Sequence, residues 1–434
     1  MLRIDPEQRF SCAQCGRCCR RWDVLITDAE RDTYVRRGAA RWFRETDAGS
    51  EGTDRDPFEP VAGWRGYHRI RARADGACGF LSAENRCRLH EQLGATSKPL
   101  TCRMFPFKFH PVQASVVVTA SFGCPTIVEN RGELVSGDAM RRSLEDTWQD
   151  HDRPITGAAN RRQFVAGRSI DAPSIRILRE SLLRMLAHAP STSIGASPST
   201  RPGENSGARS GQGGLDLRAN VHRIAQVLDD LTRSRVLRLA DEDFAEYIKL
   251  TLPYAANQPA PPKVANEGGL GRIGRLMQFG FLYVVAATRY AIDHRGDTRW
   301  SLRIGRLRLL AHFHRLAPAV DRVNVRVLRR QRVDVNAPAI QPVAYHYLRA
   351  SIEGLGARER PVLDDFAIAV SCLNAACALA VMNAHASGRA IDREIFSDAL
   401  MESVDVLHAD DRGLLGWALP RLAARVEALK VLAR

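Results

Sequence analysis

The feature that most constrains this chain is a run of four cysteines close to its start. Cys12, Cys15, Cys18 and Cys19 lie within eight residues, in the stretch FSCAQCGRCC. The first three recur every third residue, and this spacing lets a looping backbone aim successive sulfurs at one centre, as in zinc knuckles and iron–sulfur sites. The stretch therefore predicts a centre that binds a soft metal.

The remaining cysteines are distributed unevenly. Eight of the 10 cysteines lie in the first 124 residues, namely Cys12, Cys15, Cys18, Cys19, Cys78, Cys87, Cys102 and Cys124. The other two, Cys372 and Cys377, lie in an alanine-rich run and are predicted to be buried core thiols. Core thiols would not segregate in this way, so the first third of the chain is predicted to be a cysteine-ligand module.

The grouping of the eight thiols stays open at this point. Adjacent side chains point apart in most backbone conformations, so Cys18 and Cys19 are not expected to bind the same single ion. The alternatives are two four-cysteine sites, one polynuclear cluster, or one four-cysteine site with spare thiols. Arg17, Arg20 and Arg21 either lower the thiol pKa values or are surface arginines of a basic protein.

Short elements are expected between the cysteines. The pattern predicts a strand over Asp23–Thr27 and then a helix to Phe43, with Thr27 as N-cap and Glu30 completing a capping box. Ala48–Gly63 is predicted to be a loop. Cys78 and Cys87 bracket a turn that could join two strands, and Ala114–Phe122 is the clearest strand, ending just before Cys124.

The second half has helical periodicity. Amphipathic helices are expected in Ser174–Leu186, from Val221, and in Arg272–Asp293, Ser301–Leu316, Pro361–Ala386, Asp392–Leu407 and Leu414–Leu432, with no convincing strand beyond residue 214. The predicted fold class is an α+β N-terminal cysteine-rich metal module with short strands, followed by a mainly α-helical C-terminal domain. The expected segments are 1–150, a connecting helical segment 151–188, a flexible linker or loop 189–214, and a helical domain 215–434.

Five motifs in a fixed order support a family resemblance. CAQCGRCC with Trp22 and VLIT is followed by CGFL, CRLH, KPLTCRMFPF and GCP, between about residues 10 and 126. This order resembles the bacterial CxxCxxCC cysteine-cluster family of zinc- or iron-chelating proteins, which includes a flagellin lysine-N-methylase branch. The resemblance implies that all eight N-terminal cysteines are metal ligands, with Arg103 and Pro106 as supporting residues.

Three functions follow as expectations. The leading one is a metal-binding protein that holds zinc or an iron–sulfur cluster, with a 4Fe–4S cluster favoured. The alternative, implied by the methylase branch, is an iron–sulfur-dependent protein lysine N-methyltransferase, which alone would need S-adenosylmethionine. A third is a metal-handling chaperone. No catalytic residue is predicted.

Other motifs are weaker. Gly269, Gly271 and Gly274 form a G-x-G-x-x-G, but a proline-rich loop and not a strand precedes it, so a dinucleotide or S-adenosylmethionine loop is not predicted. His90, three residues after Cys87, is predicted to pack or to support a ligand. His312 and His314 face about 200° apart on a helix and are not expected to share an ion.

The net charge indicates which kinds of partner the protein could bind. The formal net charge of +14 is compatible with an acidic or protein partner of the basic helical half, for example through Arg322–Arg332, although without interleaved aromatics no nucleic-acid platform is indicated. The start lacks the pattern of a secretory signal, so a cytoplasmic location is expected. Phe366–Ala386 approaches membrane length, but its alanine content favours a buried bundle helix over a transmembrane segment.

Overall fold

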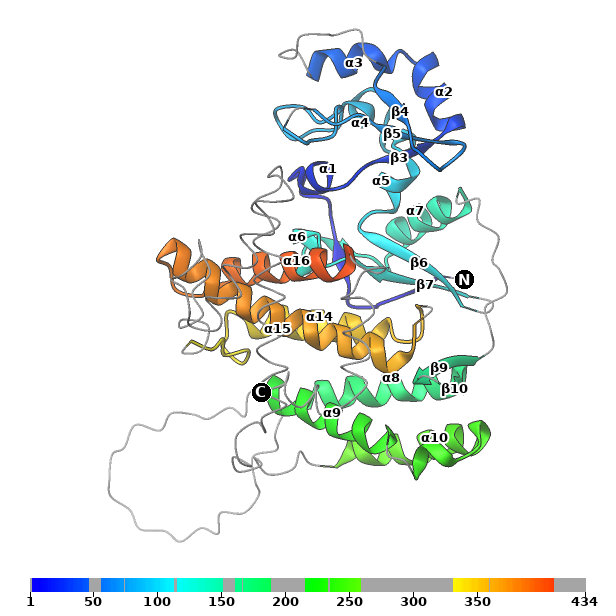
Figure 1. Ribbon diagram of the computed structural model, residues 1–434, viewed down its shortest axis with the longest axis vertical. Coiled ribbons are helices and arrows are strands. Elements are labelled where there is room, and N and C mark those ends of the chain that lie inside the picture. Colours follow the sequence, from blue (N-terminus) through cyan, green and yellow to red (C-terminus); the bar gives the residue numbers. More distant parts are fainter. Residues whose placement is uncertain are drawn as a thin grey trace. The chain divides into compact units, whose positions relative to one another are not determined.

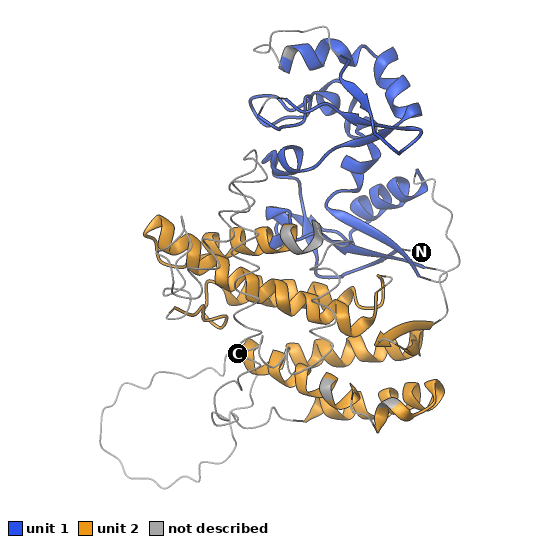
Figure 2. Cartoon of the chain, viewed as in Figure 1, with its two compact units in different colours: residues 1–158 blue, residues 159–434 orange. Residues whose placement is uncertain are grey.

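The chain folds into two compact units, 1–158 and 159–434 (Figure 2). The computed structural model describes residues 2–46, 56–73, 75–112, 115–150, 161–165, 167–188, 215–232, 235–258, 331–358 and 360–409. Several expected elements lie outside these described residues: the linker 189–214 and the helices Arg272–Asp293, Ser301–Leu316 and Leu414–Leu432.

Unit 1 combines short strands with short helices, as the sequence predicts (Figure 1). Its strands are β1 (Leu2–Ile4), β2 (Arg9–Phe10), β3 (Leu25–Thr27), β4 (Phe58–Pro60), β5 (Tyr67–Ile70), β6 (Phe107–Val112), β7 (Ser115–Ala120) and β8 (Glu133–Leu134). Its helices are α1 (Arg17–Arg21), α2 (Asp28–Arg36), α3 (Ala39–Thr46), α4 (Arg88–Leu93), the 3-10 turn Ala95–Ser97, α5 (Leu100–Met104), α6 (Pro125–Val128) and α7 (Asp138–Gln149).

The strands of unit 1 form three small sheets. β6 and β7 make an antiparallel hairpin, and β1 lies parallel to β7 with Leu2 opposite Val116. β5 lies between β3 and β4, and both pairings are antiparallel. β2 pairs with β8, which brings the residues just before Cys12 beside the segment that follows Cys124. Chain segments far apart in the sequence therefore meet around the cysteines.

Two expectations for unit 1 are wrong in detail. The single helix expected to end at Phe43 is two helices, α2 and α3, because the chain turns at Gly38, whose φ of +80° favours glycine. The predicted loop Ala48–Gly63 contains β4. Phe58 of β4 is 3% exposed, so burial of this ring in the core accounts for a strand where the local sequence indicates a loop.

Unit 2 is mainly helical, as expected. Its helices are α8 (Ala172–Leu186), α9 (Leu217–Thr232), α10 (Asp241–Asn257), α14 (Gln341–Glu353), α15 (Val362–Ser387) and α16 (Arg393–Ala409), with a 3-10 turn at Val236–Arg238. α8 packs against α9, α10 and α14, and α15 packs along α16 (Figure 1). Leu178 and Leu182 of α8 are fully buried, which confirms the apolar face read from the sequence.

One hairpin of unit 2 lies in the connecting segment 151–188, which was expected to be helical. β9 (Arg161–Val165) pairs antiparallel with β10 (Arg168–Asp171). Phe164 and Ile170 are fully buried, and the ring of Phe164 lies 5.4 Å from that of Phe244 on α10. Contacts with the helices thus stabilise strands whose own sequence signal is too short to detect.

α15 is long and apolar enough to cross a membrane by length and composition. However, 83% of its most apolar window is buried inside the structure, mainly by packing within unit 2. This burial agrees with the buried bundle helix expected from the alanine-rich sequence.

Candidate metal centre

The adjacent predicted ligands Cys18 and Cys19 lie on α1. Cys18 and Cys19 place their sulfurs 3.8 Å apart, so the two side chains do not point apart as expected. A tetrahedral site with metal–sulfur bonds of about 2.3 Å separates its sulfurs by about 3.8 Å. The hydrogen bond with Cys19, followed by burial, raises the pKa of Cys18 above its ordinary range.

Cys78 joins this pair through the backbone. Its amide N–H donates to the carbonyl oxygen of Cys19 at 2.7 Å, and Cys78 also forms a β-bridge with Ala72. The next residue of the CGFL motif, Gly79, has no room for a side chain, since a Cβ there would overlap the ring of Phe43 and the carbonyl of Arg71. Burial raises the pKa of Cys78 to about 12, so the free thiol is protonated at neutral pH.

Cys87 comes from the other side of the same turn. It forms a β-bridge with Leu81 and is the N-cap residue of α4, while the amide of Ser82 donates to the carbonyl of Arg86 at 2.8 Å. The two cysteines therefore do not pair with each other across a hairpin. His90 on α4 is exposed, so the packing role expected for it is wrong.

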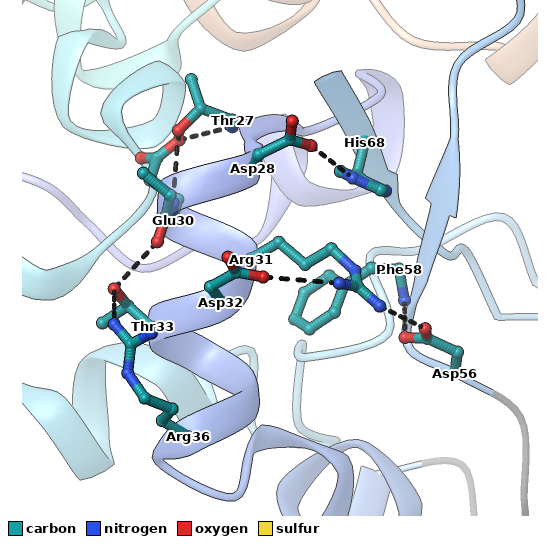
Figure 3. Close-up of polar contacts among 11 residues, drawn as sticks. Thr27, Asp28, Glu30, Arg31, Asp32, Thr33, Arg36, Asp56, Phe58 and His68 are labelled. Carbon is teal, nitrogen blue, oxygen red and sulfur yellow. Dashed lines mark hydrogen bonds and ion pairs between the residues drawn. The ribbon is translucent and has the colours of Figure 1, made fainter. Parts of the chain in front are cut away.

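Cys102 lies on α5, and the start of α5 is hydrogen-bonded to the capping box of α2. The hydroxyl of Thr27 accepts from the amide of Glu30 at 3.2 Å, and the Glu30 carboxylate accepts from the amide of Thr27 at 2.9 Å, which confirms the capping box (Figure 3). The other oxygen of Glu30 accepts from the amide of Leu100, the first residue of α5, at 2.7 Å. One carboxylate thus fixes both the start of α2 and the start of the helix that carries Cys102.

Arg103, in the last turn of α5, makes hydrogen bonds on both sides of this helix. Its Nε donates to the carbonyl of Lys98 at 3.1 Å and its Nη1 to the carboxylate of Asp150 at 2.6 Å. The ring of Phe105 meets that of Trp22, just after α1, at 4.2 Å between centroids. These contacts connect the KPLTCRMFPF motif to α1 and to α7.

Four thiols therefore approach one another from α1, the Cys78 turn, the start of α4 and α5. Burial raises the pKa of Cys102, as do the neighbouring Cys78, Cys87 and Cys18, whose charges would repel its own. Cys78, Cys87 and Cys102 pack against one apolar cluster that includes Phe80. We call Cys18, Cys78, Cys87 and Cys102 the buried thiol group.

Two cations near the buried thiol group were missed by the sequence reasoning. Lys98 lowers the pKa values of Cys18 and Cys102, and Arg73 lowers that of Cys78, each against the larger effect of burial. The position of Lys98 at the start of the KPLTC motif could have indicated it. Arg17 and Arg20 instead donate to the carbonyl of Gly123 and the side chain of Asn85.

Cys19 lies beside Cys18, and the other predicted ligands are Cys12, Cys15 and Cys124. Cys124 is 7% exposed and is the N-cap residue of α6. Burial raises its pKa, while hydrogen bonds from the amides of Ile127 and Thr126 oppose the rise and the charge of Cys15 adds to it. Cys12 and Cys15 are exposed. Cys15 is thus near enough to Cys124 for its charge to act on that thiol.

Comparison with known families supports a chelating role for this region. Residues 11–125 match the CxxCxxCC family, described as "Putative zinc- or iron-chelating domain". This segment is a CxxCxxCC domain. The match confirms the resemblance read from the ordered motifs, and all eight N-terminal cysteines lie within it. No curated protein and no solved structure matches the chain.

The thiols of the CxxCxxCC domain fit a soft metal by their chemistry and by the spacing of Cys18 and Cys19. Within the described ranges, however, no three His, Cys, Asp or Glu side chains are positioned to hold one ion as they stand. The described arrangement brings Cys18, Cys78, Cys87 and Cys102 near one another without forming a closed site.

The other candidates of the sequence analysis add nothing to the CxxCxxCC domain. Cys372 is fully buried in α15, and burial raises its pKa to about 11, in agreement with a core thiol. Cys377 is only partly exposed on the same helix. The glycine pattern 269–274 and the pair His312 and His314 lie outside the part of the chain that the structure describes.

Unit 2 has a hollow of about 450 Å³ at the C-terminal end of α15. Arg332, His385 and Arg389 contribute to its lining, so it is basic. Arg389 is already paired with the carboxylates of Asp392 and Glu394, at 2.7 and 2.8 Å. Nothing in these contacts indicates a catalytic group.

Proposed function

We propose that unit 1 binds zinc or iron through its cysteine thiolates, and that this metal completes the folding of the CxxCxxCC domain. The observation that carries the proposal is the buried thiol group: four segments between residues 18 and 102 bring their thiols near one another, and Cys78, Cys87 and Cys102 pack against one apolar cluster. Thiolate sulfur is the ligand that zinc and iron–sulfur clusters share. The eight N-terminal cysteines are the proposed ligand set.

The raised pKa values of Cys78 and Cys102 support the same coupling, as does the open arrangement of the thiols among the residues that the structure describes. Buried neutral thiols are tolerated in the metal-free domain, and metal binding replaces their protons with a cation that offsets the thiolate charges. The bound group is zinc or an iron–sulfur cluster, and the 4Fe–4S form is the iron cluster favoured by the number of clustered cysteines. Methyl transfer to protein lysines stays a prediction that rests on the sequence resemblance.

Anaerobic purification of the full chain tests the proposal. We expect bound metal, with broad absorption near about 400 nm and equimolar sulfide for an iron–sulfur cluster, or a colourless zinc protein for a thiolate zinc site. Cys102→Ser should lose metal, because it removes a member of the buried thiol group. Cys377→Ser, on α15 of unit 2, is the matched control and should keep it.

A well-folded wild-type protein that binds neither zinc nor iron after reconstitution would refute this function. Equal metal loss in Cys102→Ser and Cys377→Ser would also refute it, because the loss would then not depend on the CxxCxxCC domain. A metal that passes readily to an acceptor would favour the chaperone expectation over a permanent structural site.

A further inference from the structure

The outer face of α10 in unit 2 exposes two large apolar side chains. Leu250 is 69% exposed and Tyr254 is 70% exposed, the highest values among the large apolar side chains of the described residues. The two lie four residues apart, so they are neighbours on one face of the helix. Adjoining apolar side chains on a protein surface indicate an interaction site, whereas single ones are common and need no explanation.

The packing of unit 2 directs this apolar pair away from its core. Phe244, Ile248 and Leu252 of α10 are buried, and α10 packs against α8 and β10 (Figure 1). At 3.6 residues per turn, Leu250 lies on the side of the helix opposite these three residues, and Tyr254 lies beside it. The core of unit 2 therefore leaves this face of α10 open.

The charges of α10 are concentrated in its first turn. Residues 241–243 are all acidic. From Glu246 to Gln258, the only charged residues are Glu246 and Lys249, whose charged groups lie 3.7 Å apart. This stretch is therefore net neutral, on a chain with a formal net charge of +14. It offers no excess charge to an acidic or basic partner, but two copies of the chain can approach through it without repulsion.

We propose that α10 joins two copies of this chain, with two α10 helices packed antiparallel and Leu250 of each copy against Tyr254 of the other. A two-fold axis between the helices makes this contact twice. The antiparallel direction follows from the charges, because it places the two acidic first turns about 30 Å apart along the helices, whereas a parallel pair would bring them side by side. One helix pair is smaller than a standard interface of about 1,600 Å², so the dimer should dissociate on dilution.

Sedimentation equilibrium of the full chain tests this interface. A reductant prevents disulfides between copies through the exposed Cys12 and Cys15. The mass should rise with concentration from that of one chain toward that of two. Leu250→Glu should weaken association by at least about 10-fold, because each dimer loses two apolar contacts. Val35→Glu, at a 51% exposed position on α2 of unit 1, is the matched control and should leave association unchanged.

A mixture of two variants tests the antiparallel pairing itself. Leu250→Glu and Tyr254→Lys should each associate weakly alone. Mixed in equal amounts, they should regain much of the wild-type association. The introduced carboxylate of one copy then faces the introduced ammonium group of the other, while the remaining leucine and tyrosine still meet.

Three results would overturn the proposal. A wild-type chain that stays monomeric at every concentration would do so, as would association that Leu250→Glu leaves unchanged or that the mixture fails to restore. A fall in the melting temperature of a monomeric chain on Leu250→Glu would show that the face is covered within the chain. Because α10 carries none of the proposed metal ligands, these results would leave the proposed function intact.

Discussion

In unit 1, burial shifts the pKa values of Cys78 and Cys102 more than nearby charges do. Burial is the largest cause of the raised pKa of Cys78 and of Cys102, and the cations Lys98 and Arg73 offset it only in part. Without a metal, Cys78 and Cys102 are therefore neutral near pH 7, which avoids uncompensated negative charges in a partly buried cluster. A bound cation is what makes the thiolate forms stable there.

Proton release on metal binding follows from these values. Because the pKa of Cys78 is about 12, this thiol is fully protonated at pH 7 and must lose its proton to become a ligand. Its contribution to zinc affinity should therefore fall as the pH falls, by about tenfold per pH unit for each proton released. Zinc added to the metal-free protein in weak buffer with a pH indicator should release at least about one proton per ion.

Calcium provides a control for the proton release that zinc should cause. Calcium, which prefers oxygen ligands, should release no protons from the same protein. Zinc affinity that stays constant between pH 6 and pH 8 would show that the thiols bind as species already ionised, in conflict with the buried surroundings of Cys78.

Individual helices and strands show which parts of the fold could be predicted from the sequence. The Thr27 and Glu30 capping box and the strand β7 were predicted, because each depends on residues close together in the chain. β4 and β9 were missed, because Phe58 and Phe164 become strand residues only through burial against distant partners. The eight N-terminal cysteines as one ligand set stay a prediction, and the meeting of Cys78 with Cys19 depends on a long-range backbone hydrogen bond that no local pattern encodes.

Glu30 provides a test at the scale of the elements. Glu30→Ala removes its bonds to Thr27 and to Leu100, so it should destabilise unit 1 by about 1–2 kcal/mol. Because α5 carries Cys102, zinc affinity should also fall, by about 10- to 100-fold if the carboxylate acts as an outer-shell support. Chemical denaturation and chelator competition measure the two effects.

Two variants of the same helix separate capping from positioning. Thr27→Ala loses the N-cap bond and should cost about 1 kcal/mol with little change in zinc affinity, since Leu100 keeps its acceptor. Thr33→Ala removes an exposed hydroxyl that donates to the carbonyl of Ala29 and accepts from Arg36, and it should be nearly neutral. Equal zinc affinity in Glu30→Ala and Thr27→Ala would exclude a role for Glu30 in placing Cys102.

At the scale of the whole molecule, the two units differ in what stabilises them. Unit 1 contains sheets of two or three short strands, and such sheets are marginal without further support. Unit 2 buries most of α15, including Phe366, Leu379 and Val381, and packs it along α16. A metal that binds only the folded CxxCxxCC domain adds its binding free energy to unit 1 alone.

Metal removal should therefore unfold the units separately. Zinc at about 1,000 times its dissociation constant stabilises a folded domain by about 4 kcal/mol, and a chelator withdraws this contribution from unit 1. Limited proteolysis after chelation should digest the region before about residue 158 and leave a helical fragment of unit 2, while circular dichroism retains most of its helical signal. Added zinc should restore protection of the N-terminal region. If both units instead lose protection together, their stabilities are coupled and the metal supports the entire chain. Unit 2 carries none of the proposed ligands, so its unfolding after chelation would mean that its stability depends on the folded CxxCxxCC domain.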